Sequence, residues 1–371
     1  MLVGVVGGGQ LGRMLALAGI PHGHRFRFLD PDPACPASAV GDVECGAYDD
    51  LAALERFASG LDAATFEFEN VPAATIDALS ALVPTAPGSR SLAVAQDRIA
   101  EKQFFRSCGI RVQAFEAVST EAELAAACGR VGTPAVLKSR RMGYDGKGQS
   151  VVRSVRDLAD AWRAVGGVPC IYEAFVDFSC EVSMIAVRAR DGDVRTWALS
   201  MNEHRGGILH RTVAPAPRLP AHVGEEADRA MRTAIEALGH VGVLAIEFFV
   251  TPEGLVANEM APRVHNSAHW TIDGAVTSQF ENHVRAVCDE PLGSTDLRGA
   301  SGMVNLVGSM PDRADLLSVP GARLHDYGKS PRPGRKLGHV NVCAPDERVR
   351  DAQLRVLEEL VARAAAPVRA G

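Results

Sequence analysis

Short apolar runs alternate with helical patterns over the first ninety residues of the chain. Leu2–Val6 is apolar apart from one glycine and leads into three glycines, after which apolar positions recur at helical spacing over residues 10–18. Residues 26–29 and 64–68 predict a second and a third strand, with helices between and after them. This alternation predicts βαβ units and therefore a parallel sheet.

The pattern changes after residues 83–89, whose prolines and glycine predict a domain boundary. Asp97 can cap a helix that runs to about Ser107, and the rest of the chain predicts a mixed α/β fold with hairpins around 191–193 and 251–253. The predicted strands are 112–118, 135–138, 170–172, 181–190, 194–201, 243–250, 254–260, 303–307 and 339–343, and the predicted helices are 121–128, 157–165, 225–238 and 347–366.

Length and composition place the chain among soluble globular proteins. Its 371 residues suffice for two or three domains, and 47% hydrophobic with 23% charged residues allows a sizeable core. A net charge of −6 argues against a general nucleic-acid binder, which needs a basic face. No apolar run is long enough to cross a membrane, and no signal peptide is expected. Eight scattered cysteines without a C-x-x-C pair favour a cytoplasmic protein.

Lysine is scarce in this chain. Only five of the 39 basic residues are lysines, namely Lys102, Lys138, Lys147, Lys329 and Lys336. Because arginine serves elsewhere, a lysine is expected where a compact ammonium fits and a planar guanidinium does not. Four of the five fall within the motifs described next, which strengthens that expectation.

Residues 7–12 read GGGQLG and match the pattern G-x-G-x-x-G between a predicted strand and a predicted helix. Glycines let the backbone approach a ligand closely, and a helix N-terminus attracts a phosphate. With Asp30 at the end of the second strand, the pattern also fits a dinucleotide site. A dinucleotide, another phosphate compound and a turn without ligand therefore stay open at this point.

A second glycine-rich segment, GYDGKGQ at residues 143–149, follows a strand that ends at Lys138. Its backbone N–H groups can fold over phosphates, and Lys138 and Lys147 add positive charge, which favours a phosphate lid over a bare hairpin loop. Further on, the strand end at 172–176 offers a backbone edge for adenine. Glu181 offers a carboxylate for ribose hydroxyls, with an exposed strand acid as the alternative.

Two acidic residues, Glu247 and Glu259, stand on the arms of the second hairpin between apolar neighbours, so both are predicted to face inward. Buried carboxylates need a partner or a metal, and converging oxygens together with phosphates hold magnesium; salt-bridged core acids are the alternative. Arg263, His265 and Asn266 follow, and a basic group, an imidazole and an amide suit a small oxyanion. Zinc is disfavoured because no H-E-x-x-H motif is present.

The segment YGKSPRPGRKLGH at residues 327–339 concentrates five basic side chains in a loop made rigid by glycine and proline. A solvated charged loop is the ordinary interpretation of such a run. The rigid turn residues and the scarcity of lysine favour a phosphate-binding pocket instead.

The order of these motifs resembles the ATP-grasp superfamily, and within it most closely the 5-(carboxyamino)imidazole ribonucleotide synthetase family. The matching segments are GGGQLGRM, LDPD, FEFENVP, QDR, VLKSRRMGYDGKGQ, EVSMIAV, AIEFFVTPEGLVANEMAPRVHNSAHWT and GRKLGHVNV. The resemblance implies a homodimer with an N-terminal Rossmann-like domain (1–95), an ATP-grasp domain (96–297) and a C-terminal domain (298–371). Such enzymes use ATP and Mg²⁺ to join bicarbonate to the amine of 5-aminoimidazole ribonucleotide in purine synthesis, through carboxyphosphate.

The resemblance also implies roles for individual residues. Around ATP it places Arg98, Lys138, Gly143, Tyr144, Asp145, Gly146, Lys147, Gly148, Gln149, Glu173, Ala174, Phe175, Val176, Glu181, His204, Asn258 and Glu259. It assigns magnesium to Glu247 and Glu259, and the bicarbonate chemistry to Arg263, His265 and Asn266. For the ribonucleotide it implies Gly9, Gln10, Leu11, Tyr144, Lys147, Lys329 and Arg335.

Two features depart from the family pattern, and two rival functions stay open. Met142 replaces a frequent glycine and Lys147 a frequent arginine, which bears on the mobility of the lid more than on its charge. Another ATP-grasp ligase, such as a formate-dependent transformylase or a biotin carboxylase, is disfavoured by the short C-terminal region and the GRKLGH segment. An NAD-dependent oxidoreductase leaves Lys138, the lid and the acidic pair unexplained.

Overall fold

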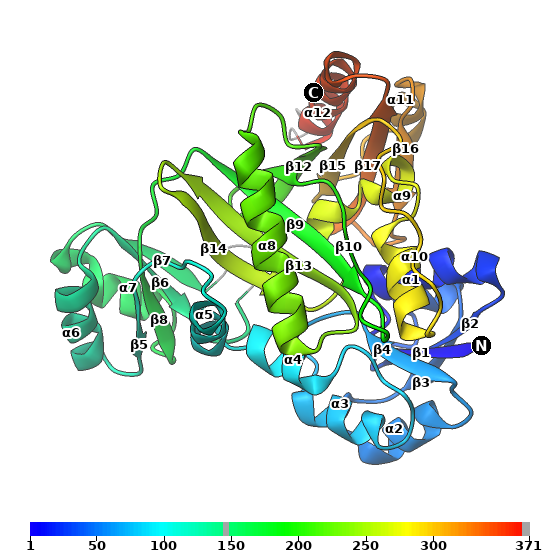
Figure 1. Ribbon diagram of the computed structural model, residues 1–371, viewed down its shortest axis with the longest axis horizontal. Helices are drawn as coiled ribbons and strands as arrows, with labels where there is room; N and C mark the ends of the chain where they lie inside the picture. Colours follow the sequence, from blue (N-terminus) through cyan, green and yellow to red (C-terminus); the bar gives the residue numbers. More distant parts are fainter. Residues whose placement is uncertain (144–147, 366–371) are drawn as a thin grey trace, which may run out of the picture.

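Three β-sheets form the frame of the protein, which the computed structural model describes over residues 1–143 and 148–365 (Figure 1). The N-terminal residues build a four-stranded parallel sheet, and a nine-stranded sheet fills the centre. A four-stranded antiparallel sheet lies at the far end of the molecule from the N-terminal sheet. The mixed α/β class predicted from the sequence is confirmed.

The N-terminal sheet has the strand order β3-β2-β1-β4, and every neighbouring pair is parallel, as predicted. Its strands are β1 (Leu2–Val6), β2 (Arg25–Asp30), β3 (Asp42–Cys45) and β4 (Ala63–Phe66); its helices are α1 (Gln10–Gly19), α2 (Leu51–Ala58), α3 (Ala73–Ser80) and α4 (Ser89–Ala95), with short 3₁₀ turns η1 (Ile20–His22) and η2 (Pro36–Ala39). Side chains of β1 contribute to two separate hydrophobic clusters, one with α1 and one with α2 and α3. The sheet is therefore packed on both faces.

The small antiparallel sheet has the order β5-β8-β6-β7 and is covered by α6 and α7 (Figure 1). Its elements are β5 (Phe115–Val118), α6 (Glu121–Val131), β6 (Ala135–Ser139), β7 (Gln149–Val152), η3 (Val155–Asp157), α7 (Leu158–Ala164) and β8 (Cys170–Ala174). β6 and β7 are paired on either side of the glycine-rich segment, so Lys138 lies directly opposite Gln149 at the root of that segment.

The large sheet runs in the order β14-β13-β9-β11-β12-β15-β17-β16, with β10 added to β9. Its strands are β9 (Cys180–Arg188), β10 (Val194–Thr196), β11 (Ser200–Arg205), β12 (Ile208–Ala214), β13 (Gly242–Thr251), β14 (Gly254–Ala261), β15 (Ala300–Val307), β16 (Arg323–Asp326) and β17 (Lys336–Ala344). Around it lie α5 (Arg98–Ser107), α8 (Ala221–Leu238), η4 (Asn266–Ala268), α9 (Thr271–Gly274), α10 (Gln279–Val287), α11 (Arg313–Ser318) and α12 (Glu347–Ala365).

Both predicted hairpins and the predicted cap of α5 are confirmed. β13 pairs with β14 and β9 with β10, all antiparallel, and the Asp97 carboxylate accepts hydrogen bonds from the N–H groups of Ile99 (3.1 Å) and Ala100 (3.4 Å). The predicted strand 194–201 is interrupted between Thr196 and Ser200. Thr196 pairs with Ala186 and Ser200 pairs with Ser183, so this stretch contains one residue more than the facing stretch of β9. This one-residue bulge accompanies the burial of Trp197 in the core.

The sheet is continuous across the boundary predicted between residues 297 and 298. β12 pairs with β15 from Arg211–Val304 to Ala214–Ser301, and β15 in turn pairs with β17 along its whole length. The C-terminal strands therefore extend the central sheet and do not form a sheet of their own.

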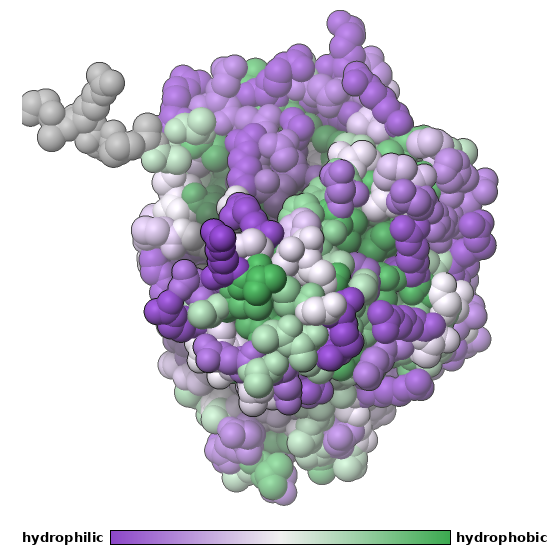
Figure 2. All heavy atoms as spheres, turned by 90° about the vertical axis from the view of Figure 1, so that its left-hand side faces the viewer, coloured by the Kyte–Doolittle hydropathy of each residue, from purple (hydrophilic) through white to green (hydrophobic). Residues whose placement is uncertain are grey.

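The end of the molecule that carries the small sheet presents a largely hydrophilic surface with a small hydrophobic group near the middle of the view (Figure 2). Exposed apolar side chains in this part of the chain include Val151, Val155 and Val168. Among the helices of the described residues, none combines the length and the apolar character needed to cross a membrane.

Candidate active site

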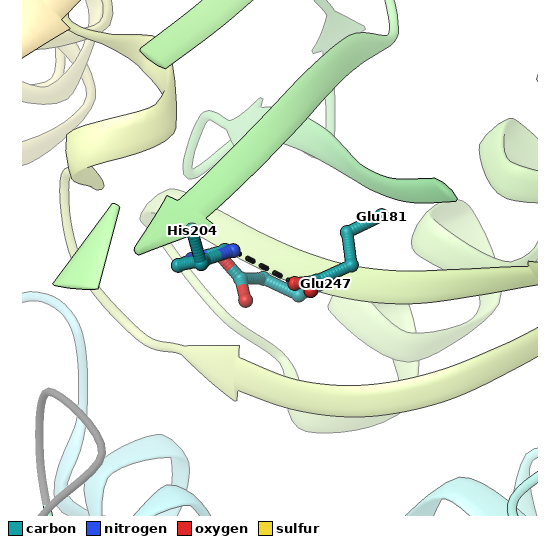
Figure 3. A group of neighbouring side chains, drawn as sticks. All are labelled: Glu181, His204 and Glu247. Carbon is teal, nitrogen blue, oxygen red and sulfur yellow. Dashed lines mark ion pairs between the residues drawn. The ribbon is translucent and has the colours of Figure 1, made fainter. Parts of the chain in front are cut away.

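Three neighbouring strands of the large sheet bring Glu181, His204 and Glu247 together (Figure 3). On β13, Glu247 lies opposite Ser183 of β9, and Glu181 stands two residues away on the same strand face. His204 comes from β11, next to a register shift after Glu203. One ligand atom of each of the three residues lies within 4.8 Å of the others.

His204 and Glu181 form an ion pair, with 2.8 Å between Nδ1 and the carboxylate. Burial alone would lower the pKa of His204, but the hydrogen bond to Glu181 and the negative charge of Glu247 raise it above its ordinary value. The imidazole therefore binds a proton more readily than an ordinary histidine, and it lies beside the buried Glu247.

Glu247 and Glu259 are direct neighbours across the β13–β14 ladder. Glu247 is buried, and burial together with the charge of Glu259 raises its pKa to about 7. Glu259 resists the same effect of burial because the Arg98 guanidinium, 3.2 Å away, lowers its pKa. Two carboxylates in this position destabilise each other unless a cation lies between them.

The oxygen-rich surroundings of this pair fit magnesium. The Oδ1 atom of Asn258 is buried and has no hydrogen-bond partner among the described residues. Carboxylate and amide oxygens are ligands that Mg²⁺ accepts, usually together with phosphate oxygens. Both acids were predicted to face inward: Glu247 is buried, whereas 41% of the Glu259 side chain is exposed. Glu181 and His204 lie beside Glu247, a grouping that the sequence did not predict.

A buried cluster of charges lies on the other side of Arg98. Glu173 forms ion pairs with Lys138 Nζ at 2.8 Å and with Lys102 Nζ at 3.4 Å. Although burial opposes ionisation, the two ammonium groups hold the pKa of Glu173 at about 2. The carboxylate of Glu173, predicted only as part of an adenine-binding edge, thus anchors Lys138 at the end of β6.

Lys102 is fully buried and was not among the predicted site residues. Its ammonium donates to the carbonyl oxygens of Ala257 (3.0 Å) and Asn258 (2.5 Å), so it holds β14 beside the site. The scarcity of lysine was the one signal in the sequence that pointed to it, because lysine was expected where a compact ammonium is preferred to a guanidinium.

Lys138→Arg is expected to raise the KM for ATP by about tenfold or more, although the charge is kept. The ammonium is seated against the buried Glu173 at 2.8 Å, and the broader guanidinium has to displace that carboxylate or itself. Steady-state kinetics with ATP as the varied substrate measures the effect. Lys147→Arg serves as the control and is expected to change the KM little; equal costs for the two substitutions would refute the steric argument.

Arg263 and His265 follow β14 and face the same region. Arg263 forms an ion pair with Glu69, and in spite of burial this contact holds the pKa of Glu69 at about 2. His265 Nε2 lies 3.8 Å from the Glu247 carboxylate, and burial followed by the charge of Arg263 lowers the pKa of His265 to about 3. The imidazole is therefore neutral, whereas the guanidinium carries the positive charge of this part of the site.

Asn266 has both side-chain amide atoms buried without a hydrogen-bond partner in the described part of the chain. Such groups are costly to bury unless a ligand or water satisfies them. Beside Arg263 and His265, this amide adds a donor and an acceptor that are directed at no other described residue. The predicted trio is brought together on one short segment.

The glycine loop at the start of α1 is occupied by protein carboxylates. Glu67 accepts from the N–H groups of Gly9 and Gly12, both at 2.6 Å, and Asp30 accepts from Gly8 N–H at 2.7 Å. Burial raises the pKa of Glu67. Glu67 was not predicted as a functional residue, and its carboxylate now lies where the sequence placed a phosphate.

Lys329 of the C-terminal loop reaches the start of α1, where its ammonium donates to the side-chain oxygen of Gln10. Arg335, also predicted there, donates to the Ser330 carbonyl at 3.3 Å. The structure thus brings Gln10 and Lys329 together, and it places Leu11 among the buried residues of α1.

The remaining predicted nucleotide residues lie around the small sheet. Ala174, Phe175 and Val176 line a hollow of about 490 Å³ together with residues of the β13–β14 turn. Gly143, Gly148 and Gln149 lie on either side of residues 144–147, next to the paired ends of β6 and β7. Tyr144, Asp145, Gly146 and Lys147, predicted to bind ATP, lie outside the described residues.

Three family models match successive parts of the chain. Residues 1–96 match the ribonucleotide synthetase preATP-grasp domain, residues 103–280 the ATP-grasp domain, and residues 301–353 the phosphoribosylaminoimidazole carboxylase C-terminal domain. These matches follow the chain in the order in which the sequence motifs occur.

Proteins of known name are similar to this chain over nearly its full length. The N5-carboxyaminoimidazole ribonucleotide synthase of Pseudomonas aeruginosa is 47% identical over 97% of this chain and 99% of its own. The crystal structure of the N5-carboxyaminoimidazole ribonucleotide synthetase from Thermus thermophilus has a TM-score of 0.93 at 48% identity, covering 99% of this chain and 100% of that one. The Aspergillus clavatus enzyme in complex with ADP and 5-aminoimidazole ribonucleotide has a TM-score of 0.91 at 30% identity, with 98% of each chain covered.

Proposed function

The chain belongs to the N5-carboxyaminoimidazole ribonucleotide synthase family of ATP-grasp ligases, and we propose how its residues divide that reaction between them. The enzyme uses ATP and bicarbonate to carboxylate the amine of 5-aminoimidazole ribonucleotide in purine biosynthesis, with ADP and phosphate as the other products. The observation that carries the assignment is the position of Glu247. Glu247 lies between the Glu181–His204 pair and His265. It therefore links the residues assigned to ATP with the residues assigned to bicarbonate.

ATP is assigned to the space between the small and the large sheet. Lys138, fixed by Glu173, is suited to neutralise phosphate oxygens, and Arg98 reaches the same region from α5. Glu181 and His204 are placed at the ribose, and the backbone of 173–176 at adenine. Gly143, Gly148 and Gln149 lie at the root of a lid whose central residues, 144–147, lie outside the described part of the chain.

Magnesium is assigned to Glu247 and Glu259, with Asn258 as a further oxygen donor nearby. When bound, the ion supplies positive charge that offsets the repulsion between the two carboxylates and the charge of the phosphates.

The bicarbonate chemistry is assigned to Arg263, His265 and Asn266. A bicarbonate oxygen attacks the γ-phosphorus of ATP, the bond to the β-phosphate oxygen breaks, and carboxyphosphate and ADP form. The amine nitrogen of the ribonucleotide then attacks the carboxyl carbon, phosphate leaves, and the nitrogen loses a proton. The Arg263 guanidinium stabilises the oxyanion, while neutral His265 and Asn266 offer hydrogen bonds without adding charge.

The ribonucleotide is assigned to the pocket between α1 and the C-terminal loop, with Gly9, Gln10, Leu11, Lys329 and Arg335. Tyr144 and Lys147 of the lid complete this assignment. We also propose a cytoplasmic homodimer with domains at 1–95, 96–297 and 298–371; the similarity to the family supports these points, and the mass of the particle in solution tests the dimer.

An NAD-dependent oxidoreductase is the weaker alternative on the geometry of the first sheet. Asp30, which such a site reserves for ribose hydroxyls, accepts from the N–H of Gly8 at 2.7 Å and from the hydroxyl of Tyr48 at 3.1 Å. The N–H groups of Gly9 and Gly12 are bonded to Glu67. The acid that a dinucleotide needs for its ribose hydroxyls is therefore already bonded within the protein.

ADP release in bicarbonate buffer tests the proposed reaction. It is expected to depend on Mg²⁺ and to rise strongly when 5-aminoimidazole ribonucleotide is added. ADP release with formate and other acceptor amines is the control for another ATP-grasp ligase. Equilibrium binding of NADH, followed by its absorbance, is the control for an oxidoreductase. ADP release that ignores the aminoimidazole ribonucleotide contradicts the assignment.

Gly9→Val is expected to raise the KM for the ribonucleotide by about tenfold or more and to leave the KM for ATP within about twofold. A Cβ atom at Gly9 would lie 2.3 Å from a Glu67 oxygen, so the carboxylate has to move within the pocket assigned to the ribonucleotide. Initial rates with each substrate varied in turn measure both constants. Gly88→Val, where a Cβ atom would meet open space just before α4, is the control; a larger change for ATP than for the ribonucleotide contradicts the assignment of this pocket.

A further inference from the structure

A buried glutamine holds the main chain of His265 at two points. The N–H of His265 donates to Gln279 Oε1 at 2.8 Å, and Gln279 Nε2 donates to the carbonyl oxygen of His265 at 2.7 Å. Gln279 opens α10, has no exposed surface, and donates through its own N–H to the Thr271 hydroxyl at 3.1 Å. No predicted role and no step of the proposed reaction uses it.

The orientation of this amide is determined by its partners. If the amide were flipped, its NH₂ would face the His265 N–H and its oxygen would face the His265 carbonyl. The Nε2 atom also lies 3.1 Å from His269 Nδ1, which accepts its second hydrogen. The three hydrogen bonds of the amide therefore need one acceptor and two donor hydrogens on residue 279, which a glutamine supplies and a carboxylate does not. They also require that Nδ1 of His269 carries no proton.

His269 is itself fixed by aromatic neighbours. Its ring lies 4.8 Å from that of His339, and His339 Nδ1 bonds to the hydroxyl of Tyr327 at 2.8 Å. The main-chain oxygen of His269 accepts from Asn341 at 2.9 Å. The support behind Gln279 is thus continuous with β17, and its members are buried.

The clamp determines where the His265 ring points. With its main chain held, His265 bonds through Nδ1 to the Ser267 hydroxyl at 2.8 Å and accepts weakly from the Ser267 N–H at 3.4 Å. Since Nδ1 accepts, the ring proton sits on Nε2, which lies 3.8 Å from the Glu247 carboxylate. His265 therefore presents an N–H donor to the site assigned to bicarbonate.

We propose that Gln279 is a positioning residue for the carboxylation reaction, which acts by holding His265 so that its Nε2–H faces the bicarbonate site. The inference rests on the proposed function, because it gives His265 its role in the chemistry. Gln279 does not touch substrate; it acts through the residue that does.

Gln279→Glu tests the proposal. The substitution keeps the acceptor for the His265 N–H but replaces the donor by a carboxylate oxygen that faces the His265 carbonyl and His269 Nδ1. We expect kcat to fall by about 10²-fold, as for a catalytic group displaced by about 1 Å, with the KM for ATP unchanged within about twofold. Gln279→Asn keeps the amide but is one CH₂ too short to reach both main-chain atoms of His265. It is expected to lower kcat and leave the KM for ATP unchanged in the same way, and it tests the proposal if the glutamate variant does not fold.

Asn282 provides a matched control three residues further along α10. It is equally buried and clamps Gly293 in the same manner, accepting from its N–H at 2.7 Å and donating to its carbonyl at 3.1 Å. Asn282→Asp is expected to lower the melting temperature as Gln279→Glu does, without the fall in kcat. A similar fall in both variants would show that the effect is one of general stability and would overturn the proposal.

A double-mutant cycle with His265→Ala decides whether Gln279 acts through His265. In the His265→Ala background, Gln279→Glu is expected to change kcat by less than about twofold, because the group that it positions is gone. A full additional loss in that background, or an unchanged kcat in the folded single variant, would overturn the proposal. Failure of the proposed function is recognised separately, because the unmodified enzyme would then show no ADP release dependent on the aminoimidazole ribonucleotide.

Discussion

Glu247→Gln is expected to lower kcat by about three orders of magnitude. The carboxylate is buried directly opposite Glu259, and replacing it removes an oxygen ligand that carries charge from the site assigned to magnesium. Loss of several kcal/mol of charge stabilisation corresponds to a change of this size in rate. Glu259→Gln is expected to have a similar effect, since both acids are assigned to the same ion.

The two substitutions are expected to differ in their effect on stability. The pKa of Glu247 is raised from 4.5 to about 7, so the folded protein keeps a proton that the unfolded chain loses between these values. Stability falls as the pH rises through this interval, and glutamine abolishes that fall. Glu247→Gln should therefore melt above the unmodified protein at pH 8 in the presence of a chelator, with the difference vanishing below the ordinary pKa of a glutamate.

Glu259→Gln should show the opposite sign. Arg98 lowers the pKa of Glu259, so its carboxylate contributes stability above the unfolded pKa that is lost only as the pH falls through the lower, folded value. Melting curves between pH 4 and 8 without metal, together with ADP release at millimolar Mg²⁺, measure both effects. Glu253→Gln, at the exposed turn of the same hairpin, is the control. Substantial turnover by the variant that carries both Glu247→Gln and Glu259→Gln would contradict the assignment of magnesium to these two residues.

Arg263→Lys is expected to lower kcat by about 10²- to 10³-fold, in the range found when one donor to an oxyanion is lost. The guanidinium bonds to Glu69 and to the Val264 carbonyl, and an ammonium cannot satisfy both while facing a planar carboxyphosphate. The pH dependence of stability should change as well, because an ammonium pairs less well with Glu69 than the guanidinium that lowers its pKa to about 2. Single-turnover measurements of ADP formation report the chemical step.

A matched arginine separates the loss of an ion pair from the loss of an oxyanion donor. Arg130 makes a two-point contact with Glu116, at 3.0 and 3.1 Å, on the exposed side of the small sheet. Arg130→Lys disturbs a comparable pair away from the site and is expected to leave kcat unchanged. If Arg263→Lys retained more than about a third of the activity, charge alone would suffice at this position and the oxyanion role would be wrong.

Periodicity predicted most of the fold because the buried strands are apolar runs. β1, α5 and the β13–β14 hairpin were predicted with boundaries within one or two residues, since glycine, Asp97 and Pro252 mark their ends. β3, β7, β12 and β16 were not predicted. β3, β7 and β16 are short edge strands, and β12 carries His210, Arg211 and Thr212, whose polar side chains interrupt any apolar pattern. Such strands form because their neighbours offer a hydrogen-bonding edge.

The site was harder to predict from the sequence because its members meet through tertiary contacts. Glu247 and Glu259 could be paired since one hairpin joins them. Glu67, Lys102 and Gln279 could not, because each acts on the backbone of a segment more than 10 residues away in the chain. A buried side chain that bonds to a main-chain atom produces no spacing pattern in the sequence. Its partner can be identified only from the folded structure.

The pairing of β12 with β15 has a consequence for how the chain can be divided. An enzyme that ended before residue 298 would present the unpaired edge of β12, and the severed C-terminal part would present that of β15. Exposed edges of this kind recruit strands from other molecules, so each fragment alone would be prone to aggregate. Because these two edges pair with each other in the intact protein, the two fragments are expected to reassemble when they are supplied together. Permuted forms of this enzyme, which keep all strands of the large sheet on one chain, are therefore best opened at a surface turn such as Asp191–Asp193.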